Sequence, residues 1–242
     1  MTMHRRRVWA IVRKESREYR RNRSIVVTMA IIPLLFSVQP LVAVLSLAHS
    51  EALAHEHVLL YMLGIPTLVP LFVAAYAVAG ERAQGSLEPV LTTPIPREEF
   101  LLAKAVAAFV PSLIVSYAVF AVFLGIVAVF AHPGVAADVM QGSDLLVQVV
   151  FTPLLAGWSI WVAIGVSTRA TDVRVAQQLS LLASIPTVLV IVLFALNVIA
   201  PSVSLAVTIA TGAAALLVML NLAGWRVTSR LFDRERLITS TR

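Results

Sequence analysis

The most prominent pattern along the chain is a series of six long apolar stretches, none of which contains a charged residue. A helix needs roughly 20 apolar residues to cross a bilayer core about 30 Å thick. Each stretch meets that length, and the pattern therefore predicts an all-α membrane protein with six transmembrane helices. The predicted spans are residues 24–48, 58–79, 105–131, 145–168, 175–200 and 202–225.

Composition supports a membrane protein and excludes three other classes. Hydrophobic residues make up 59% of the 242 positions and charged residues 13%, whereas soluble domains are about 45–50% apolar and about 25% charged. This excess excludes a soluble enzyme and a disordered chain. The chain has no cysteine, which excludes a secreted disulfide scaffold, zinc–thiolate sites and thiol catalysis.

The positive charges predict the orientation of the spans. All nineteen Lys and Arg residues lie in four segments, 1–23, 80–104, 169–174 and 226–242, and the connections between these segments have none. Cytoplasmic segments of membrane proteins are enriched in Lys and Arg. We therefore expect both termini to be cytoplasmic, which agrees with an even number of spans. This topology accounts for the net charge of +6, so nucleic acid is not an expected partner.

Residues 5–23 combine apolar and basic positions in a helical arrangement. Val8, Trp9, Val12 and Tyr19 can share one face, and basic side chains occupy the other. This pattern predicts an amphipathic interfacial helix along the cytoplasmic lipid headgroups, with its aromatic residues at the interface. The alternative is a topology signal without a docked helix. The residues singled out in this helix are Trp9, Lys14, Glu15 and Tyr19.

The segment 80–104 has the most specific pattern in the chain. Gly85 permits a sharp turn, and Pro94 and Pro96 stop any helix before the third span. Glu98 and Glu99 would then lie in the first turn of that span, where the helix dipole favours acids. A short amphipathic element with exposed charges between two spans is suited to docking a soluble partner. The motif runs Glu81-Arg82-x-x-Gly85-Ser86-Leu87-Glu88-Pro89-x-Leu91-x-Thr93-Pro94-Ile95, followed by Arg97, Glu99 and Lys104.

This motif resembles the signature of type-2 ABC transporter permeases. Lys14, Glu15 and Arg20 before the first span, and Ala176-Gln177-Gln178 at the start of the fifth, resemble further elements of that family. Pro96 departs from the Ser or Thr that the family often has. The resemblance covers essentially the whole chain.

The resemblance implies a permease that pairs with a second permease chain, as a homodimer or a heterodimer, in the cell membrane. It also implies a cytoplasmic ABC ATPase subunit that docks on the 80–104 loop. The expected ATPase-coupling residues are Glu81, Arg82, Gly85, Ser86, Leu87, Glu88, Thr93, Pro94 and Arg97. None of the ten glycines precedes a lysine, so the chain has no phosphate-binding loop of its own. We expect a non-enzymatic subunit without bound cofactors, with ATP and magnesium in the partner ATPase.

The sequence thus divides into an interfacial helix (1–23), a six-span permease domain (24–225) with the coupling loop 80–104, and a basic tail (226–242). The expected function is the translocation pathway of an ATP-driven exporter. The alternative is a non-transporting membrane scaffold or immunity-type protein with the same fold. Because the six stretches have no Asp, Glu, Lys, Arg or His, an amphiphilic, lipid-like or drug-like substrate is favoured over an ion. The polar residues expected along the pathway are Gln39, Ser116, Gln148 and Asn221.

Two further patterns have competing interpretations. His49, Glu51, His55, Glu56 and His57 could bind a transition metal, but a short solvated loop is favoured and we predict no metal site. The Gly-x-Ser pattern at residues 157–159 is similar to that of rhomboid-type intramembrane proteases. Such a serine needs a histidine on another span, and all five histidines lie outside the spans. The glycine and serine are therefore interpreted as small residues at a helix–helix contact.

Overall fold

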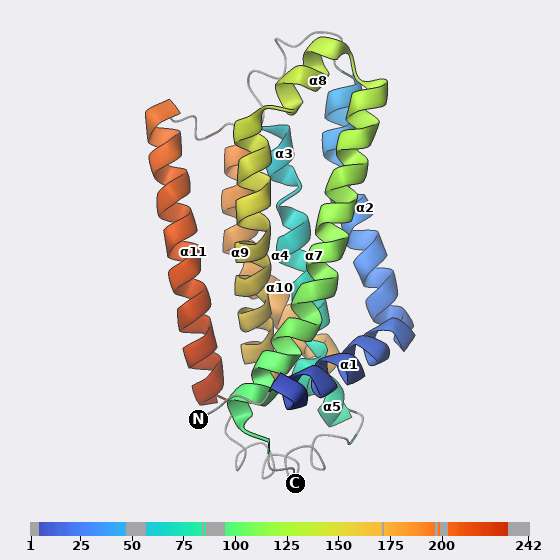
Figure 1. Ribbon diagram of the computed structural model, residues 1–242, viewed down its shortest axis with the longest axis vertical. Coiled ribbons are helices and arrows are strands. Elements are labelled where there is room, and N and C mark those ends of the chain that lie inside the picture. Colours follow the sequence, from blue (N-terminus) through green and yellow to red (C-terminus); the bar gives the residue numbers. More distant parts are fainter. Residues whose placement is uncertain are drawn as a thin grey trace.

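The computed structural model describes residues 5–46, 57–83, 85, 95–170, 172–196, 198 and 203–231 (Figure 1). These residues are almost entirely helical and include no strand, which confirms the all-α prediction. The helices are α1 (Arg5–Arg21), α2 (Arg23–Ser46), α3 (Val58–Tyr61), α4 (Gly64–Ala74), α5 (Tyr76–Ala83), α7 (Arg97–Phe130), α8 (Pro133–Val139), α9 (Gly142–Ser167), α10 (Val173–Ala195) and α11 (Val203–Leu231).

Within the described residues, six helical segments are long and apolar enough to cross a membrane, which confirms the six predicted spans. The second span comprises α3, α4 and α5, and the others are α2, α7, α9, α10 and α11. The third span begins at Arg97 rather than at the predicted 105, with Pro96 at its N-cap and Glu98 and Glu99 in its first turn, as the prolines predicted. The last span continues to Leu231, beyond its predicted end at 225.

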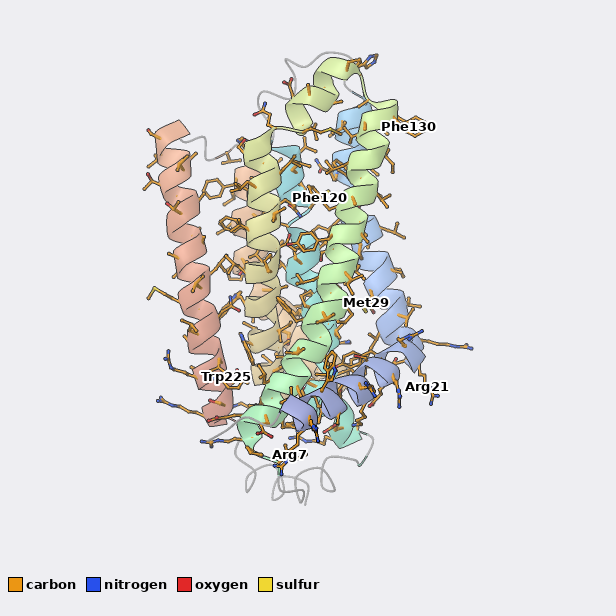
Figure 2. All side chains as sticks on the ribbon, in the orientation of Figure 1. Arg7, Arg21, Met29, Phe120, Phe130 and Trp225 are labelled. Atoms are coloured by element: carbon orange, nitrogen blue, oxygen red, sulfur yellow. The ribbon has the colours of Figure 1, made fainter. Side chains whose placement is uncertain are left out.

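The second span forms the centre of the bundle. In its most apolar 18-residue window 83% of the residues are buried within the chain, against 6% in the last span. Helix α1 lies across one end of the bundle, here called the basal end, and α8 lies at the opposite end (Figure 1). Figure 2 places Arg7 and Arg21 of α1 at the basal end with Trp225 of α11, and Phe130 of α7 at the opposite end. Both the first and the last described helices therefore reach the basal end.

The second span is interrupted twice. Between α3 and α4 the interruption has a local cause, because Pro66 has no N–H to donate to the carbonyl of Met62 four residues earlier. The N–H of Ile65 bonds to that carbonyl instead, at 3.1 Å. Such interruptions are tolerated in a span that is surrounded by protein, where other groups can satisfy the freed backbone.

Side chains from two other spans enter the second interruption, at Ala75. In a continuous helix the carbonyl of Phe72 and the N–H of Val78 would have partners four residues away. Here Gln177 of α10 donates to the Phe72 carbonyl at 3.5 Å, and Ser167 of α9 accepts from the Val78 N–H at 3.1 Å. Side-chain insertion into the backbone ladder is a recognised cause of helix kinks. The central span is thus completed by α9 and α10.

Helix α11 packs against α9 through two glycines. A Cβ added at Gly157 of α9 would lie 2.3 Å from Oδ1 of Asn221, and one added at Gly224 of α11 would lie 2.8 Å from Cβ of Trp161. The rings of Trp161 and Trp225 meet edge to face, with centroids 5.3 Å apart. The predicted helix–helix contact at Gly157 is confirmed. Small residues let the two backbones approach closely at this otherwise exposed helix.

Candidate functional site

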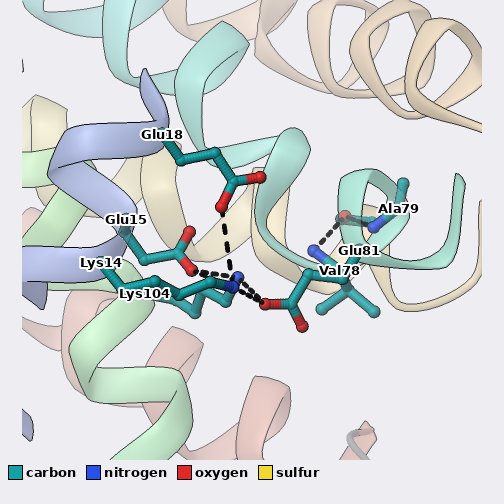
Figure 3. Close-up of polar contacts among 8 residues, drawn as sticks. Lys14, Glu15, Glu18, Val78, Ala79, Glu81 and Lys104 are labelled. Carbon is teal, nitrogen blue, oxygen red and sulfur yellow. Dashed lines mark hydrogen bonds and ion pairs between the residues drawn. The ribbon is translucent and has the colours of Figure 1, made fainter. Parts of the chain in front are cut away.

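Four charged side chains from three helices meet at the basal end. They are Lys14 and Glu15 of α1, Glu81 of α5 and Lys104 of α7, and we call them the buried charge cluster (Figure 3). Nζ of Lys104 lies 2.9 Å from Oε1 of Glu15 and 2.8 Å from Oε1 of Glu81. Nζ of Lys14 lies 3.0 Å from Oε1 of Glu81 and 3.3 Å from Oε1 of Glu15. Each ammonium thus bridges both carboxylates.

The burial of this cluster is unusual for charged groups. Lys104 is 1% exposed and Glu15 and Glu81 are each 3% exposed, while the side chain of Lys14 is about half exposed. Removing an isolated ion from water costs several kcal/mol even after the protein relaxes, so buried charges persist only when they are paired. The ring of Phe100 adds a cation–π contact, with its centroid 5.3 Å from Nζ of Lys104.

The helical period explains which residues of α1 face the bundle. Val12, Glu15 and Tyr19 are buried, and their spacing of three and four residues places them on one face. Trp9 is off that face and 60% exposed. The prediction that Trp9 and Tyr19 lie together on an interfacial face is therefore wrong, because Tyr19 is covered by the protein itself. The buried face of α1 has a carboxylate at its centre.

The cluster shifts the titration of two groups on α1. Burial acts to lower the pKa of the Lys14 ammonium, but the hydrogen bond to Glu81 and the charges of Glu15, Glu81 and Glu18 raise that pKa above its ordinary value. Burial raises the pKa of the Tyr19 hydroxyl, and the charges of Glu15 and Glu18 raise it further. In both cases the fold favours the protonated form. Their contribution to stability is therefore full below about pH 10 and lost as the pH rises through the shifted values.

We expect Tyr19 to ionise later than an ordinary tyrosine during alkaline titration. Its raised pKa predicts that tyrosinate absorbance assigned to Tyr19, as the difference between the wild type and Tyr19→Phe, develops above about pH 10. The thermal stability of the wild type should decline over the same alkaline range. A Tyr19 component that titrates at or below its ordinary pKa would contradict the buried position of this side chain.

Arg82 forms a second contact at the basal end. Its guanidinium donates to the carbonyl of Ala170 and, at 3.3 Å, to that of Thr168. These carbonyls follow the end of α9, where a cation is favoured by the helix dipole. Arg82 therefore joins the base of the second span to the base of the fourth.

The structure places the predicted coupling residues in three different situations. Glu81 is buried under α1 and Arg82 is half-buried, so the expectation of an element with exposed charges is wrong for Glu81. Gly85 adopts the predicted turn conformation, with φ +68°, and Arg97 is exposed at the start of α7. The remaining coupling residues, which lie outside the described part of the chain, are Ser86, Leu87, Glu88, Thr93 and Pro94.

The predicted pathway residues lie in different surroundings. Gln39 is exposed on α2, whereas Ser116 of α7 and Gln148 of α9 are each 2% exposed. Ser116 donates to the carbonyl of Ser112 within its own helix, and Gln148 donates to Thr152 Oγ1 at 3.4 Å. Asn221 donates to the carbonyl of Leu154 and therefore serves the contact between α9 and α11.

The outer histidine and glutamate segment lies outside the described residues except for His57. Among the residues that the structure describes, no group of three His, Asp or Glu side chains is arranged to hold a metal ion.

A comparison with known families identifies a relationship over nearly the whole chain. The model of the family described as "ABC-2 family transporter protein" matches residues 9–231. The match begins within α1 and ends at the last residue of α11, so it includes all three helices that contribute to the buried charge cluster. No curated protein matches the sequence.

Proposed function

Because the chain belongs to the ABC-2 family of transporter proteins, as a multi-pass membrane permease, we propose that it forms the translocation pathway of an ATP-driven exporter. A separate cytoplasmic ATPase subunit would supply the energy, with ATP and magnesium bound there. A second permease chain, identical or different, would complete the pathway. The membrane component of such transporters is not itself catalytic.

The proposed orientation places the basal end in the cytoplasm of the cell. Two observations support it: α1 and the last turn of α11 both reach that end (Figure 1), and the four Lys- and Arg-containing segments adjoin the same ends of the spans. The 80–104 segment connects the second and third spans there, and would be the element on which the ATPase docks.

The buried charge cluster is the observation that carries the proposal. It joins α1, the base of the second span and the base of the third span through ion pairs of 2.8–3.3 Å. A force applied by the ATPase to α1 or to the 80–104 segment would therefore displace the three elements together. Rigid-body movement of packed elements is one way in which transporters switch access between the two sides of a membrane.

The interior of the spans supports an amphiphilic, lipid-like or drug-like substrate. The apolar stretches of the six spans contain no Asp, Glu, Lys, Arg or His, and the charged side chains of the observed helices, Glu81 and Lys104 among them, lie toward the ends of the spans. Ion-coupled carriers and proton pumps depend on ionisable groups at membrane depth. Transport of a small inorganic ion by the purified complex, without any amphiphile, would contradict this substrate class.

Replacing Glu81 and Glu88 together with Ala tests the proposal. We expect weaker association of the ATPase or slower transport, with membrane insertion unchanged. Glu81→Ala removes the carboxylate shared by Lys14 and Lys104, whereas Glu88→Ala alters the 80–104 segment itself, so the single variants separate the two effects. Glu98→Ala, at an exposed glutamate on the first turn of α7, is the matched control.

Co-purification distinguishes the exporter from a non-transporting scaffold. An ATPase recovered in stoichiometric amount with the chain supports the exporter. Transport that is unchanged in the Glu81→Ala, Glu88→Ala double variant would overturn the assigned coupling residues. Recovery of the chain with a partner that has no ATPase activity would favour the scaffold.

A further inference from the structure

The hydroxyl of Ser167 lies inside the backbone ladder of the second span. This side chain, at the last residue of α9, is fully buried. Its oxygen accepts hydrogen bonds from the N–H groups of Val78 and Ala79, at 3.1 and 2.8 Å, and its proton is donated to the carbonyl of Ala75 at 2.8 Å. Figure 3 draws the bonds at Val78 and Ala79. One hydroxyl therefore satisfies three backbone groups of another span.

Arg82 provides a second link between the same two elements. Its bonds to the carbonyls of Thr168 and Ala170 lie one helical turn beyond the Ser167 contact along α5. Small side chains line the same region, because Ala75 and Ala79 of the second span form one buried cluster with Ala170, just after α9, and Ala176 of α10. Helix α5 is thus bound to the base of α9 by hydrogen bonds between side chains and backbone groups, while the interruption at Ala75 separates it from α4.

We propose that Ser167 is a positioning residue that holds α5 to the base of α9, so that the two move together and a displacement of the 80–104 segment reaches the fourth span. This inference rests on the proposed transport function. Helix α5 contains the first four residues of the 80–104 segment, Glu81 among them. The interruption at Ala75 allows α5, the basal part of the second span, to change direction relative to α4. Ser167 determines which neighbouring span follows that change.

Hydrogen exchange of the full chain in lipid nanodiscs tests the contact between Ser167 and α5 without any partner. In Ser167→Ala the amides of Val78 and Ala79 lose their acceptor, and we expect them to exchange about tenfold faster or more than in the wild type. Ser167→Thr retains the hydroxyl and should restore slow exchange. The matched control is Ser37→Ala, since Ser37 is also buried but donates only to Pro33 within its own helix.

Spin-label distances in the complex with its co-purified ATPase test whether α5 and the base of α9 move together. The chain has no native cysteine, so labels can be placed at exposed Ala83 and Arg169 without background. In the wild type we expect the Ala83–Arg169 distance to be unaffected by ATP, while a reference pair at His57 and Ala83, on either side of the interruption, changes. In Ser167→Ala the Ala83–Arg169 distribution should broaden and shift when ATP is added, and Ser167→Thr should reverse this.

The outcomes separate this inference from the function on which it rests. A wild-type Ala83–Arg169 distance that changes with ATP, or a Ser167→Ala variant with wild-type exchange at Val78 and Ala79, would overturn the positioning role. If no ATPase associates and neither label pair responds to ATP, the proposed transport function is overturned and the transmission with it. In that case the exchange measurement still shows whether Ser167 holds α5 to α9.

Discussion

Replacing Lys104 with Met is expected to lower the free energy of unfolding by about 3 kcal/mol, because removal of one partner from a buried ion pair leaves uncompensated charge. Lys104 is 1% exposed and lies within 3 Å of Oε1 of both Glu15 and Glu81. Without it, the two carboxylates share only Lys14, which is half exposed. Thermal unfolding of the purified protein in detergent should show a melting temperature lower by roughly 10 °C.

Two variants control for the loss of packing at this position. Lys14→Met removes the second ammonium, but water still reaches that side chain, so its effect should be clearly smaller. Adding Glu15→Gln to Lys104→Met removes one of the two buried charges and should recover part of the lost stability. Equal effects of the Lys14 and Lys104 variants, or no recovery in the double variant, would argue against a buried ionic contact.

Gly224→Leu is expected to displace α11 from α9 and to cost about 2 kcal/mol, as overpacked helix contacts do. Even a single added Cβ would lie 2.8 Å from Cβ of Trp161, which is fixed to the backbone of α9. In the most apolar 18-residue window of the last span only 6% of the residues are buried, so few other contacts hold it. Thermal unfolding measures the loss, and quenching of Trp161 and Trp225 fluorescence by bilayer-embedded quenchers should increase as the two rings become more exposed.

The same helix provides the matched control. A Cβ added at Gly212 would meet no atom within 4 Å, and leucine has a higher helix propensity than glycine. Gly212→Leu should therefore leave stability unchanged or raise it slightly. A loss of stability in Gly212→Leu as large as that in Gly224→Leu would place the effect in the lipid-exposed surface rather than in the contact with α9.

The spans could be predicted from the sequence because each is a local property of the chain. Their number is right, and Pro96, Glu98 and Glu99 gave the correct start of α7. The predicted third span nevertheless began only at 105, because a hydropathy pattern ends at a lysine. Lys104 lies within the helix because glutamates 89 and 23 positions earlier neutralise it. That pairing depends on tertiary structure, which a pattern along one sequence does not contain.

The candidate site was predicted less completely, for the same reason. The motifs include Glu81 and Glu15, but the pattern predicts an exposed position for each, since charged residues are almost always exposed. No motif includes Ser167. A serine at the end of an apolar stretch has no pattern that distinguishes it in the sequence. The role of Ser167 becomes visible only through its hydrogen bonds to the second span at the interruption near Ala75. The resemblance over Ala176-Gln177-Gln178 marked Gln177, whose bond to Phe72 is visible only in the fold.

The interruption at Ala75 also constrains how the protein is made. The groups that complete the second span, Ser167 and Gln177, are 89 and 105 positions further along the chain than Val78 and Phe72. At a synthesis rate of about 5–20 residues per second, Ser167 and Gln177 are made roughly 5 to 20 s after the part of the second span that they contact. An isolated nascent second span would expose unpaired backbone to lipid. It should therefore stay in contact with the insertion machinery until the fourth and fifth spans emerge.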